Sequence, residues 1–319
     1  MRTSTTLIAY TGGLAVVFAA ALGVGAVTGS PIDMTSTHTD SHATADPSAG
    51  SSAQPGAGSV AGSVPAGLQV AQDGYTLGEI SAPARAGESG RLSFSIRDAS
   101  GDPVRAYDEL HEKQLHLIVV RSDTSEFRHV HPTLGSDGRW SIDWIWPTGG
   151  TYRVFADFQA SGAPGQLTLG RNVDVAGDLQ PAPLPPPSRT TTVDGYTVTL
   201  TGDLTTTGGP LTLRVSRDGV PVTDLDPYLG AYGHLVALRT GDLAYLHVHP
   251  EGAPGDGVTT PGPDISFHAQ APSGGTYRLF LDFRHEGTVR TAEFTVPVGP
   301  EDAPAPGSAP AHDGHEGGH

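Results

Sequence analysis

Short stretches of alternating apolar and polar residues run through the middle of the chain. Residues 92–96 (Leu-Ser-Phe-Ser-Ile) and 211–215 (Leu-Thr-Leu-Arg-Val) alternate with a period of two and end at turn-forming residues. Neither region sustains the 3.6-residue apolar period of an amphipathic helix over a long stretch. Because successive side chains of a strand point to opposite faces, this pattern predicts half-buried β-strands and an all-β fold.

The pattern occurs in two blocks, residues 67–178 and 190–299, which align from end to end. Each block opens with Asp-Gly-Tyr-Thr, at residues 73–76 and 194–197. Eight of ten positions are identical between residues 149–158 and 274–283. This self-similarity predicts an internal duplication of one domain.

Each block has the length and strand content of an immunoglobulin-like sandwich, about 110 residues with some seven short strands. Tyr152 and Tyr277 each follow a Gly-Thr pair at the entry to a late strand, which is the position of the tyrosine corner in such sandwiches. We therefore predict two tandem immunoglobulin-like β-sandwich domains. A cupredoxin-like barrel is the alternative architecture.

An apolar stretch near the N-terminus predicts a membrane-targeting segment within residues 1–29. Residues 7–27 carry no charge and are long enough to span a bilayer, whereas Val24-Gly25-Ala26 would also suit signal cleavage. Arg2 should stay on the inner side of the membrane. We expect a single-pass membrane protein with extracytoplasmic C-terminal domains, or a secreted protein if the segment is cleaved.

Three further segments are predicted to be linkers or tails. Residues 30–66 are rich in Ser, Ala, Gly and Pro and bury too little apolar surface to fold. Residues 179–189 contain a Pro-rich run and predict a semi-rigid linker between the two domains. Residues 300–319 predict a disordered tail, whose three histidines are a candidate for opportunistic metal chelation.

Charge and cysteine usage exclude several function classes. The net charge of −16 and a single lysine, Lys113, argue against nucleic-acid binding, which requires a basic face. The chain has no cysteine, so disulfides, thiolate metal sites and thiol catalysis are excluded.

Histidines recur with the same spacing in both repeats: a histidine, twelve residues, a histidine, one residue, and a His-Pro pair. A hairpin that turns at residues 123–124 places His116 opposite His131 and Ile118 opposite His129. The three imidazoles of the first repeat then share one face of the hairpin, at the end of an apolar stripe. Opposed Cβ atoms lie about 4.5–5.5 Å apart, so three imidazoles can converge on a metal ion. The predicted ligands are His116, His129 and His131 in the first repeat, and His234, His247 and His249 in the second.

Imidazole donors without thiolates favour Cu(II) or Zn(II) as the bound ion. The only methionines, Met1 and Met34, lie outside both domains, which argues against a thioether Cu(I) carrier. Other recurring polar residues near the histidines are candidates either for metal ligands or for acceptors that orient an imidazole. These are Asp157, Asp282, Asp108 and Asp226, together with His111, which only the first repeat contains.

A histidine on a strand is more often a packing residue than a ligand, and duplication copies packing positions as well as ligands. The retention of three histidines on one face in both repeats favours a metal-binding or metal-buffering protein. A surface protein that contacts an unknown protein partner without metal is the alternative, and a metal-dependent enzyme is a third possibility. We expect no enzymatic activity, because the aspartates are the only recurrent candidates for a general base.

The hairpin motif also resembles a known group of sequences. His-x-His-Pro and Gly-Thr-Tyr-Arg-x-Phe-x-Asp-Phe occur in both repeats, and His-Leu-x-Val occurs in the first. These motifs resemble actinobacterial exported proteins described as heavy-metal-binding. More distantly, an exported β-sandwich with histidines is similar to CopC-like and YtkA-like copper-handling domains. The resemblance implies copper handling outside the cytoplasm. It departs from the CopC-like pattern because no histidine stands at the start of the first domain.

Overall fold

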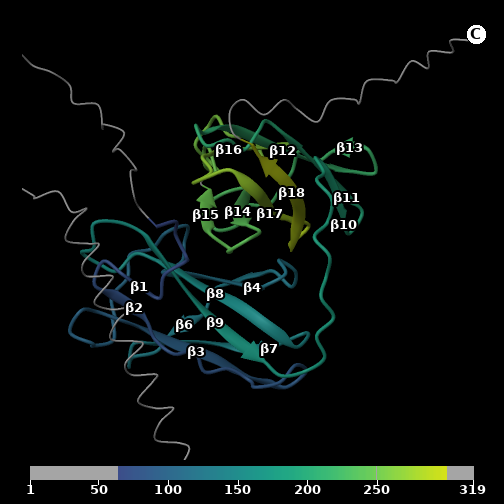
Figure 1. Ribbon diagram of the computed structural model, residues 1–319. Helices are drawn as coiled ribbons and strands as arrows, with labels where there is room; N and C mark the ends of the chain where they lie inside the picture. The colour runs from purple at the N-terminus through teal and green to yellow at the C-terminus, as the bar shows by residue number, and fades with distance from the viewer. Residues whose placement is uncertain (1–63, 249, 300–319) are drawn as a thin grey trace, which may run out of the picture. The chain divides into compact units, whose positions relative to one another are not determined.

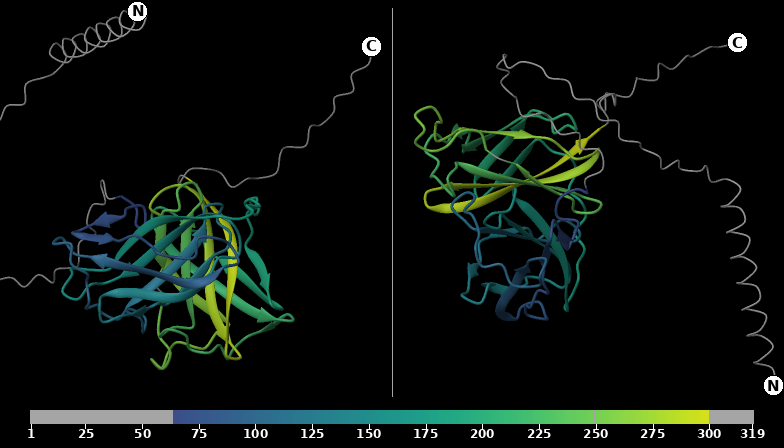
Figure 2. Two further views of the ribbon diagram at one scale, coloured as in Figure 1. Left: turned by 90° about the horizontal axis from the view of Figure 1, so that it is seen from below. Right: turned by 90° about the vertical axis from the view of Figure 1, so that its left-hand side faces the viewer.

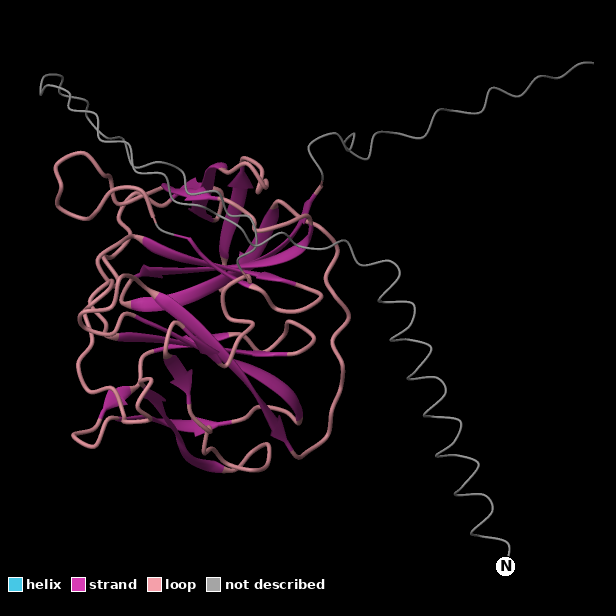
Figure 3. Ribbon diagram, turned by 60° about the vertical axis from the view of Figure 1, so that its left-hand side comes forward, coloured by secondary structure: helices cyan, strands magenta, loops and turns pink. Residues whose placement is uncertain are grey.

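The computed structural model describes residues 64–248 and 250–299, which belong to one compact unit. Within these residues the chain forms strands, turns and loops and contains no helix (Figure 3). None of the described residues form a helix that could span a membrane. The predicted N-terminal membrane segment, most of the first linker and the C-terminal tail lie outside the described residues.

The first repeat forms two antiparallel sheets (Figure 1). One sheet has the order β1-β2-β3-β7-β6, and the other has the order β5-β4-β8-β9. The strands are β1 (Ala71–Gln72), β2 (Tyr75–Leu77), β3 (Ser89–Arg97), β4 (Leu115–Arg121), β5 (Arg128–Val130), β6 (Thr133–Leu134), β7 (Arg139–Ile145), β8 (Gly150–Phe158) and β9 (Leu167–Val175).

The second repeat builds the same pair of sheets (Figure 2). One sheet has the order β10-β11-β12-β13 with β16 also paired to β12, and the other has the order β15-β14-β17-β18. The strands are β10 (Thr190–Val193), β11 (Tyr196–Thr201), β12 (Gly209–Arg217), β13 (Val220–Pro221), β14 (Gly233–Arg239), β15 (Tyr245–Val248), β16 (Asp264–Ala269), β17 (Gly275–His285) and β18 (Thr288–Val298).

The predicted immunoglobulin-like sandwich is confirmed in both repeats. Each repeat buries its own apolar cluster, which contains Phe94 and Trp146 in the first and Phe267 and Phe294 in the second. The strand order matches that of an immunoglobulin sandwich, in which sequential hairpins alternate between two sheets.

Both predicted tyrosine corners are present. The Tyr152 hydroxyl donates a hydrogen bond to the Thr148 carbonyl at 3.0 Å, and the Tyr277 hydroxyl donates to the Ser273 carbonyl at 3.0 Å. In each case the partner lies four residues upstream, just before the late strand. These short-range hydrogen bonds fix the conformation of the chain at the start of β8 and β17, the strands that carry Asp157 and Asp282.

A third apolar cluster joins the two repeats through the outer faces of their four-stranded sheets. Strand β4 is buried along its whole length, because one face lies in the sandwich core and the other packs against the second repeat. Phe127 stacks on Phe280, with ring centroids 3.9 Å apart and an interplanar angle of 5°. The other members of this cluster are Ile118, Val120, Phe155, Val236, Leu238, Leu243 and Tyr245.

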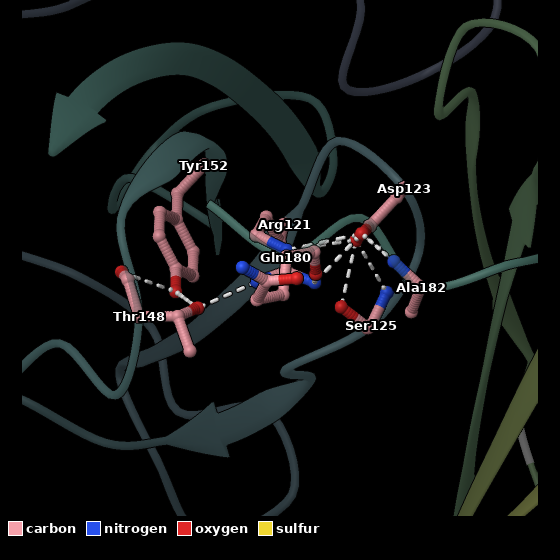
Figure 4. Close-up of polar contacts among 7 residues, drawn as sticks. All are labelled: Arg121, Asp123, Ser125, Thr148, Tyr152, Gln180 and Ala182. Atoms are coloured by element: carbon pink, nitrogen blue, oxygen red, sulfur yellow. Dashed lines mark hydrogen bonds and ion pairs between the residues drawn. The ribbon is translucent and has the colours of Figure 1, made fainter. Parts of the chain in front are cut away.

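The Pro-rich linker is hydrogen-bonded to the first repeat (Figure 4). The Arg121 guanidinium donates to the Gln180 carbonyl at 3.0 Å, and the Ala182 N–H donates to the Asp123 carboxylate at 2.8 Å. Burial opposes ionisation of Asp123, yet hydrogen bonds from Arg121, Ser125 and Ala182 hold its pKa well below the usual range. The Asp123 carboxylate, in the turn of the histidine hairpin, is therefore ionised and hydrogen-bonded to the linker.

Candidate metal centre

The hairpin β4–β5 has the register predicted from the sequence. Ile118 lies opposite His129 and Leu117 lies opposite Val130, so His131 falls opposite His116 just beyond the end of β5. Thr124 occupies the turn with a φ of 67°. The alternation of side chains along these strands places the three imidazoles on the outer face of the sheet.

The nitrogens of the three imidazoles converge on one point. His116 Nδ1 lies 3.0 Å from His129 Nε2 and 3.1 Å from His131 Nε2. The three nitrogen atoms all lie within 4.8 Å of one another. Among the described residues, these three side chains form a group with the geometry to hold a metal ion.

Hydrogen bonds on the far side of two rings determine which nitrogen carries the proton. His116 Nε2–H donates to the Leu110 carbonyl at 2.9 Å, and His129 Nδ1–H donates to the Asp282 carboxylate at 2.8 Å. In the neutral rings, His116 Nδ1 and His129 Nε2 must then carry lone pairs. Two lone pairs that face each other at 3.0 Å repel unless a proton or a cation lies between them.

The two acceptors are held in place by backbone and side-chain hydrogen bonds. Leu110 and Lys113 exchange two backbone hydrogen bonds, of 2.8 and 3.2 Å, in a tight turn that presents the Leu110 carbonyl to His116. Asp282 accepts a second hydrogen bond, of 2.6 Å, from the Thr291 hydroxyl. Asp282 belongs to β17 of the second repeat, so the centre in the first repeat is completed by the other domain.

The imidazoles of the centre are largely shielded from solvent, and burial favours the neutral form of His131. The His116 residue is 2 % exposed, and the side chains of His129 and Asp282 are 4 % and 6 % exposed. Burial, followed by the charges of His129 and His116, lowers the pKa of His131 to about 2. A neutral imidazole at physiological pH offers its lone pair without first releasing a proton.

The donor set fits a divalent transition metal. Zn(II) and similar ions bind imidazole nitrogen at about 2.0–2.1 Å, which in a tetrahedral site separates the donors by about 3.3 Å. The two separations measured from His116 Nδ1, 3.0 and 3.1 Å, differ from this value by only a few tenths of an ångström, and the third lies within 4.8 Å. Three protein ligands would leave the fourth tetrahedral position to a further ligand.

The second repeat reproduces part of this arrangement. His234 lies on β14, is 4 % exposed, and its Nε2–H donates to the Tyr228 carbonyl at 2.9 Å, as His116 does to Leu110. Burial lowers the pKa of His234 to about 4. The backbone of His247 pairs with Val236 in β15, whereas its side chain and the whole of His249 lie outside the described residues.

The remaining candidate residues occupy different places. Asp157 is buried opposite His116 on β8 and accepts hydrogen bonds from Gln166, Thr168 and Tyr245. Asp108 accepts from the Ser161 hydroxyl and Asp226 from the Gly287 N–H, so both stabilise loop ends. The His111 ring lies beside the centre, with its centroid 6.1 Å from that of His116 and 5.3 Å from that of His234.

His285 shows what a packing histidine looks like in the same chain. Its Nδ1 pairs with the Tyr196 hydroxyl at 2.7 Å and its Nε2 with the Asp224 carboxylate at 3.1 Å. Both ring nitrogens are therefore engaged by hydroxyl or carboxylate oxygen. His116 and His129 differ, because one nitrogen of each ring is engaged by oxygen and the other is directed at an imidazole.

Sequence reasoning missed the carbonyl acceptors of Leu110 and Tyr228 and the origin of Asp282 in the opposite repeat. The carbonyls belong to matching turns, Leu110–Lys113 and Tyr228–Ala231, which share the same hydrogen-bond pattern but little sequence. No residue type marks a carbonyl acceptor. The recurrence of the aspartate in both late strands was the available signal for Asp282.

Comparison with solved structures finds chains of tandem domains at low similarity. A chimeric titin Z1Z2-Z1Z2 tandem is 14 % identical, with 71 % of this chain and 100 % of that chain covered and a TM-score of 0.19. An Escherichia coli alpha-2-macroglobulin is 15 % identical, with 70 % and 20 % covered and a TM-score of 0.24. Invasin, a bacterial integrin-binding protein, is 12 % identical, with 70 % and 39 % covered and a TM-score of 0.21.

No curated protein matches the chain in sequence. A family model described as Domain of unknown function (DUF8832) matches residues 69–175 and again residues 191–300. The two matches together cover more than half of the chain. The chain therefore belongs to the DUF8832 family and carries two copies of its domain.

Proposed function

We propose that this protein binds Cu(II) or Zn(II) through His116, His129 and His131 and handles or buffers that metal outside the cytoplasm. The observation that carries the proposal is the orientation of the His116 and His129 rings. Their N–H groups donate outward to Leu110 and Asp282, and their lone pairs meet at 3.0 Å. A metal ion between them would convert this repulsion into two coordinate bonds.

The recurrence of the motif supports a second site of the same kind. His234 occupies the position of His116 and makes the matching hydrogen bond to a turn carbonyl. We propose His234, His247 and His249 as its ligands. Two ions per chain is then the expected stoichiometry of the two repeats.

Binding, rather than catalysis, is the proposed role. Asp282 is the carboxylate in contact with the centre, and it accepts hydrogen bonds on both oxygens, from His129 and Thr291. A carboxylate held in this way orients an imidazole and is not placed to take a proton from a substrate. This argument applies to the described residues that contact His116, His129 and His131.

An extracytoplasmic location is supported by the apolar segment of residues 7–27 behind Arg2. We propose that this segment either anchors the chain in the cell membrane or directs its secretion. The resemblance of the hairpin motif to exported heavy-metal-binding sequences supports the same location and role.

The alternative of a partner-binding surface protein is weakened by the cluster that joins the repeats. The apolar face beside the histidines, with Ile118, Val120 and Phe127, packs against Phe280 and its neighbours within the same chain. That face is therefore not offered to a separate protein. The recurrence of the histidine spacing in both repeats is better explained by a ligand that sits between the histidines.

Isothermal titration of the full chain with Cu(II) and Zn(II) tests the proposal. The parent protein is compared with His129→Ala and with His268→Ala, whose histidine is exposed on β16 and takes no part in the cluster. We expect one high-affinity ion to be lost in His129→Ala and none in His268→Ala. Equal binding by all three proteins, or no high-affinity binding by the parent, would refute the proposed function.

A further inference from the structure

A pocket of about 530 Å³ lies beside the metal centre. His129 and His131 are among its lining residues, and the others come from both repeats. A volume of this size is within the usual range for pockets that hold small organic molecules. The cavity therefore has room for a ligand larger than a water molecule.

Two cationic side chains line this cavity. One is Lys113, the single lysine of the chain, and the other is Arg284 from β17 of the second repeat. Both residues are partly buried. Glu112 supplies one carboxylate to the lining and is exposed. Together with a bound divalent ion, the cavity would carry a net positive charge.

Arg284 is only loosely paired within the protein. The nearest carboxylate is that of Asp226, whose oxygen lies 3.9 Å from Arg284 Nε, beyond hydrogen-bond distance. The same Asp226 oxygen accepts a hydrogen bond of 2.8 Å from the Gly287 N–H. The Asp226 contact therefore leaves the planar guanidinium donors able to engage a ligand anion.

The two cations are specific to this centre. In the alignment of the repeats, Lys113 corresponds to Ala231 and Arg284 corresponds to Gln159. A pocket lined by the equivalent residues of the other repeat would thus lack both positive charges. The histidines recur and the two cations do not, so Lys113 and Arg284 distinguish the first centre from the equivalent positions of the other repeat.

Apolar side chains make up another part of the lining. Val130, Pro227 and Leu229 border the cavity beside the two cations. An inorganic oxyanion would gain nothing from this apolar surface, whereas a carboxylate with a short hydrocarbon group would bury that group against it.

We propose that the first metal centre takes a small organic carboxylate as its fourth ligand, with the oxygens paired to Lys113 and Arg284 and the hydrocarbon group against Val130, Pro227 and Leu229. This inference rests on the proposed metal-binding function. It makes the first site a receptor for a metal–carboxylate pair.

The test uses the full chain loaded with Co(II), whose visible absorption changes when a ligand replaces water. Butyrate is titrated into the parent, Lys113→Ala, Arg284→Gln and the double variant, and inorganic phosphate is titrated in parallel. Both substitutions introduce the residue that the other repeat carries at that position. Arg214→Gln is the matched control, because Arg214 pairs with Asp264 on an exposed face outside the cavity.

Loss of a charge-assisted contact should raise the Kd for butyrate about tenfold in each single variant. The Arg214→Gln protein should bind butyrate like the parent. The Co(II) content of every protein is measured separately by elemental analysis, which distinguishes failure of the metal site from failure of the carboxylate site.

Weakened butyrate binding in the Lys113 and Arg284 variants, at unchanged Co(II) content, would support the proposal. Unchanged butyrate binding in the double variant, or no spectral response in the parent, would overturn it and leave the proposed metal site intact. Phosphate binding as tight as butyrate binding would overturn the carboxylate class. A parent protein without bound Co(II) would overturn the proposed function and this inference with it.

Discussion

Replacing Asp282 by Asn tests how far one domain controls the metal centre of the other. The substitution preserves the size of the side chain and removes its negative charge. In the parent, the Asp282 carboxylate accepts the Nδ1–H of His129 at 2.8 Å, with both side chains nearly buried. An uncharged amide is a weaker acceptor and can also turn its NH₂ group toward His129.

The expected effect is a 10- to 100-fold rise in the Kd of the first site for Zn(II), which is the usual result of losing the carboxylate behind a metal-binding histidine. This corresponds to about 1.4–2.7 kcal/mol of binding free energy. The physical cause is twofold: His129 loses basicity, and its ring is no longer held in the tautomer that directs Nε2 at the ion.

Competition with a chromophoric chelator at constant pH measures the Kd, and thermal unfolding of the metal-free protein is recorded beside it. Thr291→Val is the control, because it removes the hydrogen bond to the other Asp282 oxygen and leaves the contact with His129. We expect a change of less than about threefold in this control, since the charge is retained. An Asp282→Asn protein that binds Zn(II) as tightly as the parent would refute the assigned role of Asp282.

Three further predictions concern stability, each measured by chemical denaturation. Phe280→Ala should lower the free energy of unfolding by about 3–5 kcal/mol, because Phe280 is 1 % exposed and stacks between the repeats, whereas Val289→Ala on the exposed edge should change it by less than about 0.5 kcal/mol. Equal effects of the two substitutions would contradict the packing described for the third cluster. Asp123→Asn should destabilise the protein at pH 7, and this effect should fade as the pH falls below about 4. Folding lowers the pKa of Asp123, so the carboxylate stabilises the folded state above the pKa of the unfolded state and stops doing so when the folded state is protonated. A stability difference between parent and variant that does not shrink in acid would count against this prediction. Tyr152→Phe should cost about 1 kcal/mol by deleting the hydrogen bond to the Thr148 carbonyl, and an unchanged stability would show that the tyrosine corner contributes nothing.

The fold and the register of the histidine hairpin could be predicted from local patterns. Alternation with period two identifies strands, and a hairpin whose turn is known has a single register that satisfies the pleat. For that reason the pairing of Ile118 with His129 followed directly from the positions of the turn residues. The tyrosine corners were equally local, since Tyr152 and Tyr277 each contact a residue four positions upstream.

The contacts around the centre could not be predicted in the same way. The stripe of Ile118, Val120 and Phe127 was visible as apolar, but the sequence does not say whether such a face meets a partner, a membrane or its own duplicate. The choice of Asp282 over Asp157 as the partner of His129 depends on that packing, because both aspartates occupy equivalent positions in the sequence.

By itself, the sequence determined which residues form strands, which side chains share a face, and that the three histidines of the first repeat gather at one end of a hairpin. These are consequences of short-range geometry along the chain. Only the tertiary structure decided which ring nitrogen of His116 and of His129 carries the proton, and which groups line the pocket beside the centre. Those properties arise from the turn carbonyl of Leu110, the carboxylate of Asp282 and the cations Lys113 and Arg284. They depend on non-local packing between the two repeats. The free energy of that packing is spread over many apolar contacts, so no single residue of the sequence identifies it.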